Sequence, residues 1–107
     1  MLNGCIAISR KPTLTNIKTG ETCNGSFNVV TRKGWVVLPD GTKLTGKIFG
    51  VDNANYNSPA TQGEGWALLK SADGKQIMEI HIISNGSASS GYGNAKMNDG
   101  REFKVMW

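Results

Sequence analysis

Few side chains in this sequence could take part in catalysis or metal binding. The single histidine, His81, follows Glu79 by two residues, so the two side chains would share one face of a strand. A histidine beside a carboxylate can act as a base, yet no third group at a recognisable spacing completes a catalytic set. One histidine with scattered carboxylates also offers no cluster of metal ligands. We therefore expect a cross-strand surface pair at His81, no enzymatic activity, and no metal or cofactor.

The thiols of the chain are Cys5 and Cys23, and without a nearby histidine pair they form no zinc or redox motif. A disulfide between them would close a loop of about 18 residues and add about 3 kcal/mol in an oxidising compartment. Free thiols and modification of Cys5 are the alternatives. The residues alone leave this choice open.

The charge of the chain is modestly basic, with 12 Lys and Arg against 8 Asp and Glu. Such an excess favours nucleic acid, anionic lipid or an acidic protein without identifying any of them. The basic residues are mostly single, and only Arg10-Lys11 and Arg32-Lys33 are adjacent. No polybasic stripe that could follow a phosphate backbone is visible.

A repeated turn predicts the fold. Asp-Gly stands at 40–41, 73–74 and 99–100, each time between two segments typical of strands. Asp-Gly suits hairpin turns because glycine adopts positive φ freely and aspartate can bond its own backbone. The hairpins would join segments 35–38 and 43–51, 66–69 and 76–83, and 93–97 and 102–107.

Apolar residues alternate with others within these segments. Leu44 and Ile48 lie on one face of their strand, residues 78, 80 and 82 on one face of a second strand, and residues 103, 105 and 107 on one face of a third. With further strands at 27–31 and 5–9, we expect an all-β fold of about seven strands, a small antiparallel barrel or sandwich joined mostly by hairpins. Residues 1–12 would form an N-terminal arm, and residues 13–107 a single β domain.

The aromatic side chains bear on nucleic-acid binding, because small basic barrels bind single strands through exposed rings. Most of the rings lie in apolar runs, so we predict a core that includes Trp35, Phe49, Trp66 and Phe103. Few rings would then remain for stacking. Binding of single-stranded nucleic acid is accordingly the second alternative, and not the preferred function.

Two long polar connections, 52–65 and 84–93, each carry one tyrosine. In an up-and-down meander the three Asp-Gly turns lie at one end of the sheet and these connections at the other. That arrangement predicts a binding rim formed by Arg32, Lys33, Tyr56 and Tyr92. Rigid tyrosines beside a basic pair favour an acidic protein or another anionic partner.

Residues 2–5, Leu-Asn-Gly-Cys, resemble the end of a bacterial lipoprotein signal, in which the cysteine is acylated. Most of residues 19–107 resembles the small lipoproteins of Gram-negative envelopes, through Thr-Gly-Glu at 19–21, Leu-Thr-Gly at 44–46 and Gly-Tyr-Gly at 91–93. Members of that group often have cysteine where Glu79 and Ala95 stand, so this chain departs from the pattern there.

The resemblance implies lipid attachment at Cys5 and a non-catalytic binding or structural domain that faces the periplasm from the cell envelope. The alternative is a soluble inhibitor or immunity-type module that binds a protein and is cytoplasmic or secreted. No apolar run approaches the ~20 residues that a membrane-spanning helix needs. Lipid would therefore anchor the chain only through Cys5.

Overall fold

The computed structural model describes residues 9–51, 62–85 and 90–107, and in these ranges the chain forms strands and turns. Within them no helix is long and apolar enough to cross a membrane. The strands are β1 (Ser9–Arg10), β2 (Thr13–Asn16), β3 (Thr22–Asn28), β4 (Lys33–Val37), β5 (Lys43–Val51), β6 (Gln62–Lys70), β7 (Ile77–Asn85), β8 (Gly91–Met97) and β9 (Glu102–Met106).

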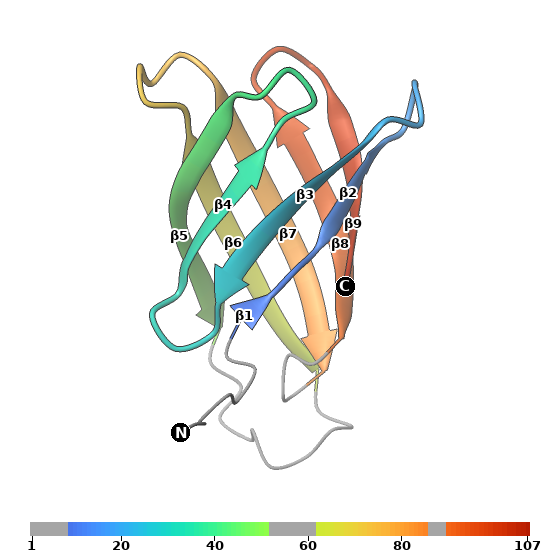
Figure 1. Cartoon of the computed structure of the whole chain (residues 1–107). Helices are drawn as coiled ribbons and strands as arrows, with labels where there is room; N and C mark the ends of the chain where they lie inside the picture. Colours follow the sequence, from blue (N-terminus) through green and yellow to red (C-terminus); the bar gives the residue numbers. More distant parts are fainter. Residues whose placement is uncertain (1–8, 52–61, 86–89) are drawn as a thin grey trace, which may run out of the picture.

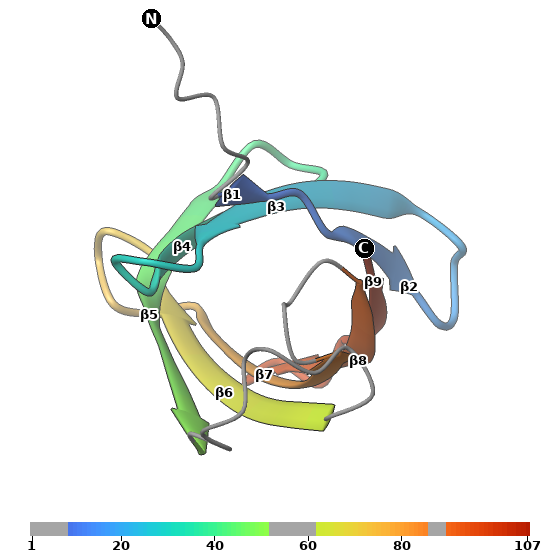
Figure 2. The same ribbon diagram turned by 90° about the horizontal axis from the view of Figure 1, so that it is seen from below.

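Strands β2 to β9 form a closed antiparallel barrel of eight strands with up-and-down connections, because β9 pairs back onto β2 (Figures 1 and 2). The short β1 is a ninth strand, which pairs with β3 on the same side as β2. The all-β prediction is confirmed. The described architecture is a barrel of eight strands plus one, where we expected about seven strands in a barrel or a sandwich.

The N-terminal third differs most from the prediction. Residues 13–16 form β2, which we did not expect, and β3 lies at Thr22–Asn28 instead of 27–31. Residues 29–31 form a turn, because the Asn28 side-chain Oδ1 accepts hydrogen bonds from the backbone N–H groups of Val30 and Thr31. Asparagine commonly ends strands in this way.

The three Asp-Gly hairpins are confirmed. Gly41, Gly74 and Gly100 have φ of 92°, 75° and 99°. Each preceding aspartate accepts a hydrogen bond from the backbone N–H two residues further on. The pKa of Asp73 is lowered chiefly by the hydrogen bond that the Ser71 hydroxyl donates to it, and the pKa of Asp99 by the hydrogen bond from the Arg101 side chain.

These turns and the turn at 17–21 lie at one end of the barrel, which we call the turn end (Figure 1). At the opposite end, which we call the mouth end, β1 begins and the turn at 29–32 joins β3 to β4. The meander on which the predicted rim depends is therefore present.

The register of the strands fixes the width of the barrel. We can step from Val51 on β5 to its partner on β6, and from partner to partner through β7, β8, β9, β2, β3 and β4. This path returns to β5 at Lys43, eight residues from its starting point, and these eight residues are the register shift of the barrel. The radius of a barrel rises with the number of strands and with this shift. Eight strands with a shift of eight leave an interior that layers of side chains fill completely.

Side chains fill the interior in layers, and one of these layers alternates small and large residues on neighbouring strands. In that layer, Ala67 of β6 and Ala95 of β8 are interleaved with Ile80 of β7 and Phe103 of β9. Small residues on every second strand make room for large neighbours in a narrow barrel. The main residues of the core, most of them inward-facing, are Leu14, Cys23, Val36, Leu38, Leu44, Ala67, Leu69, Met78, Ala95, Met97, Phe103 and Val105.

At the mouth end, Trp107 and Phe27 pack edge to face with ring centroids 5.1 Å apart. A Cβ at Gly91 would overlap the Trp107 ring, so only glycine fits there. An apolar cavity between these rings and the core has a volume of about 30 Å³, room for one or two water molecules.

Three of the four aromatic residues predicted to be buried are on the outside. The exposed fraction is 39% for Trp35, 42% for Trp66 and 60% for Phe49, whereas Phe103 is 1% exposed, as expected. Alternation explains the difference: Gly65 and Ala67 face the interior of β6, so Trp66 between them faces outward.

We predict that Phe103→Ala lowers the free energy of unfolding by about 3–5 kcal/mol, because it empties the middle of a filled core. Trp66→Ala should lower it by about 1 kcal/mol, since its ring faces solvent and packs mainly against His81. Denaturant unfolding of both variants measures the difference. Equal losses would contradict the assignment of inner and outer faces.

Candidate functional site

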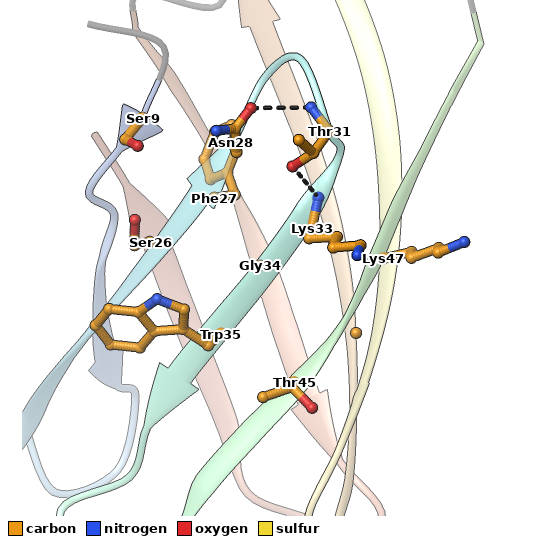
Figure 3. Close-up of a pocket in the computed structure, with 11 residues that line it drawn as sticks. Ser9, Ser26, Phe27, Asn28, Thr31, Lys33, Gly34, Trp35, Thr45 and Lys47 are labelled. Carbon is orange, nitrogen blue, oxygen red and sulfur yellow. Dashed lines mark hydrogen bonds between the residues drawn. The ribbon is translucent and has the colours of Figure 1, made fainter.

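A groove of about 510 Å³ runs along the outer wall of the barrel over β3, β4 and β5 (Figure 3). Its lining combines one indole, two ammonium groups and several hydroxyl and amide groups. The residues are Ser9, Ser26, Phe27, Asn28, Thr31, Lys33, Gly34, Trp35, Thr45, Gly46 and Lys47.

The register of β4 and β5 positions the functional side chains. Lys33 is paired with Lys47 and Trp35 with Thr45, and all four are exposed on the outer face. In Figure 3 the two lysine side chains extend in the same direction, away from the Trp35 indole. The groove therefore presents two positive charges at one side and an aromatic ring at the other.

Between these pairs, Gly34 and Gly46 are partners across the two strands. A Cβ on Gly46 would overlap the backbone carbonyl oxygen of Leu68 on β6, so β5 and β6 approach each other too closely for any other residue. We infer that the two glycines allow the wall to bend under the groove.

The electrostatics of the groove are one-sided. Strands β3, β4 and β5 contain no aspartate or glutamate. In the described part of the chain the salt bridges are His81–Glu64 and Arg101–Asp99, and neither lysine takes part in one. Like charges directly opposite each other on paired strands are destabilising. An anion placed between the two ammonium groups would offset this repulsion.

Trp35 adds an aromatic surface beside the lysines. The Nζ of Lys43 lies 5.3 Å from the centre of the Trp35 ring, within the range of a cation–π interaction. This contact brings a third positive charge to the site and holds the indole. A ligand with both an acidic group and a flat apolar face would complement this arrangement.

Arg32 lies in the turn at the mouth end, directly before the groove residue Lys33. It adopts the left-handed conformation, with φ of 61°, and its carbonyl oxygen accepts a hydrogen bond of 2.7 Å from the backbone N–H of Ile48. A Cβ on Gly50 would lie 3.8 Å from Arg32 Nη1, so the guanidinium group lies close to β5. The turn thus places Arg32 and Lys33 against one strand.

Three of the four residues of the predicted rim, Arg32, Lys33 and Tyr92, lie in the described part of the chain. Arg32 and Lys33 lie together at the mouth end, and Tyr92 is near the same end as the second residue of β8. However, β8 lies across the barrel from β4 (Figure 2), four strands away in either direction. The Tyr92 side chain is exposed there. Tyr56 and Cys5 lie outside the described residues, so the rim as a whole and lipid attachment remain predictions.

Sequence reasoning missed Trp35, Thr45 and Lys47 as site residues. Trp35 was assigned to the core, and Lys47 is opposite Lys33 only because of the register of β4 and β5. One signal was available: residues 22–39 carry no carboxylate at all.

The cross-strand surface pair expected at His81 is present, and its partner is Glu64 of β6. His81 Nε2 lies 2.5 Å from Glu64 Oε2, and the imidazole stacks on Trp66 with ring centres 5.2 Å apart. Across the described ranges, no three His, Cys, Asp or Glu side chains gather as metal ligands.

Cys23 is a free thiol, 5% exposed within the barrel. Burial raises its pKa, and the charge of Arg101 opposes this effect. The thiol is therefore the protonated form at neutral pH and belongs to the core. A disulfide to Cys5 would have to enter the barrel interior.

Comparisons of the chain with protein-family models, with curated proteins and with solved structures give no significant match. The site must therefore be interpreted from its own geometry.

We predict that Lys47→Glu raises the free energy of unfolding by about 0.2–1 kcal/mol, because it replaces a repulsive cross-strand pair with an attractive one. Lys47→Gln should give a smaller gain, and both gains should shrink in high salt. Thermal and denaturant unfolding measure these effects. A loss of stability in Lys47→Glu would show that the two charges do not repel each other.

Proposed function

We propose that this protein is a non-catalytic binding domain of the bacterial cell envelope that holds an acidic glycan in the groove over β3, β4 and β5. The observation that carries the proposal is the pairing of Lys33 with Lys47 beside an exposed Trp35. A like-charge pair reduces stability, so its presence at a groove favours a role in binding.

The remaining groups of the groove support a sugar as the ligand. Ser26, Thr31 and Thr45 supply hydroxyl groups, and Asn28 an amide, around the aromatic ring. Sugar rings combine hydroxyl groups with an apolar face that can pack on an indole. Carboxylate or phosphate groups on the sugar would bind the lysines through charge-assisted hydrogen bonds.

The cellular location rests on the resemblance to envelope lipoproteins. In this proposal Cys5 carries the lipid anchor, the barrel faces the periplasm, and no cofactor takes part. A glycan of the envelope would then be within reach.

A second candidate is an inhibitor or immunity-type module that binds a protein. The exposed rings of Phe49 and Trp66, which are paired across β5 and β6, favour it, because aromatic side chains dominate protein interfaces. Binding of single-stranded nucleic acid is also a candidate, because it was set aside on the expectation that the aromatic rings are buried, and these rings are exposed.

Calorimetric titration with tetragalacturonic acid tests the proposal, with a neutral galactose tetramer as the control ligand. We expect binding of the acidic tetramer that weakens with salt, and a loss of at least about tenfold in affinity in Trp35→Ala and in the double variant Lys33→Gln/Lys47→Gln. Lys104→Gln, on the outer face of β9, should leave the affinity unchanged.

Equal affinity for the neutral tetramer, or equal loss in Lys104→Gln, would overturn the proposed site. Tight binding of oligothymidylate with no binding of the acidic tetramer would favour nucleic acid instead.

A further inference from the structure

The described part of the mouth end is basic, whereas the charges at the turn end are mixed. The turn end carries the carboxylates Glu21, Asp40, Asp73, Asp99 and Glu102 together with the basic residues Lys18, Lys43, Lys70, Lys75 and Arg101. The mouth end carries Arg10, Arg32, Lys33 and Lys47. Glu64, a carboxylate on the mouth side, lies beside His81. Among the described residues, positive charge therefore predominates at the mouth end and not at the turn end.

The mouth end also exposes large apolar and aromatic side chains. Val30, in the turn between β3 and β4, is 69% exposed, Phe49 near the end of β5 is 60% exposed, and Tyr92 at the start of β8 is 55% exposed. At the turn end Ile17 is 54% exposed, but it lies in a turn of mixed charge that contains Lys18 and Glu21. Aromatic side chains together with Lys and Arg are typical of surfaces that contact the polar boundary of a membrane.

The positions of these three side chains limit the shape of the partner. The turn after β3 and the start of β8 lie on opposite sides of the barrel, and β5 lies between them (Figure 2). Side chains that face away from one another around a ring cannot converge on a small ligand. A flat partner that meets the end of the barrel can contact all three at once.

We propose that the mouth end is a docking surface for a lipid bilayer with anionic headgroups. Val30, Phe49 and Tyr92 would insert at the headgroup boundary, while Arg32, Lys33 and Lys47 contact the lipid phosphates. Anionic leaflets attract basic segments close to their surface, and the attraction decays within a Debye length. The turn end, where positive and negative charges are mixed, would point away from the bilayer.

This surface shares Lys33 and Lys47 with the glycan groove, but its apolar and aromatic residues are different. Val30, Phe49 and Tyr92 do not line the groove, and Trp35 lies further from the mouth along β4. Strand β1, the first described strand, begins at the mouth end (Figure 1). Docking itself does not require acylation, so it can be measured without the lipid.

Co-sedimentation with large vesicles tests the proposal, using the full chain with Cys5→Ser so that no lipid is attached. We expect binding to vesicles of phosphatidylglycerol and phosphatidylcholine, and at least about tenfold weaker binding to phosphatidylcholine alone. The triple variant Val30→Ser/Phe49→Ser/Tyr92→Ser should bind the anionic vesicles at least about tenfold more weakly. Ile17→Ser, at the turn end, is the matched control and should bind normally.

Each variant is first compared with the parent chain by circular dichroism and thermal midpoint. Trp35→Ala should retain vesicle binding, and the triple variant should retain binding of the acidic tetramer, so the two proposals can fail separately. No binding to anionic vesicles, or equal binding by the parent chain and a folded triple variant, would overturn the docking surface. If the triple variant does not fold, single Val30→Ser and Tyr92→Ser variants give the same test, and unchanged binding in both would overturn it.

Discussion

Closure of eight strands with a register shift of eight residues is the constraint on which the rest of this structure depends. It leaves an interior that one set of layered side chains fills. In one layer Ala67 and Ala95 flank the larger Ile80, and at Gly46 strands β5 and β6 approach too closely for a side chain. The same constraint places Trp35, Phe49 and Trp66 on the outer wall.

The same constraint limits where a binding site can lie, because a filled barrel leaves only its outer surface for a ligand. A wider eight-stranded barrel can hold a small ligand in its interior. Here the cavity measures about 30 Å³, and Trp107 packs against Phe27 above it. The groove over β3, β4 and β5 and the basic mouth end are the outer features that combine charge with aromatic surface.

Features encoded by neighbouring residues were predictable from the sequence. The Asp-Gly turns and the alternation of residues 78–82 and 103–107 identify hairpins and inward faces without knowledge of the fold. The strand at Thr13–Asn16 was not predictable in this way, because it is short and mostly polar and is held by pairing with β9. The direction of Trp66 was also missed, since size and apolarity alone favour burial, whereas the width of the barrel decides it. The Lys33–Lys47 pair depends on the register between strands, which only the folded barrel establishes.

Solvent accessibility of adjacent side chains on β6 tests the filled barrel most directly. A soluble gadolinium chelate broadens the NMR signals of exposed groups, and the signals of the Trp66 indole N–H and the Ala67 methyl report on opposite faces of one strand. We expect strong broadening of the Trp66 and Trp35 indole signals and protection of the Ala67 and Ala95 methyl groups and the Phe103 ring. Protection of Trp66 together with broadening of Ala67 would reverse the two faces of the barrel wall and contradict the account.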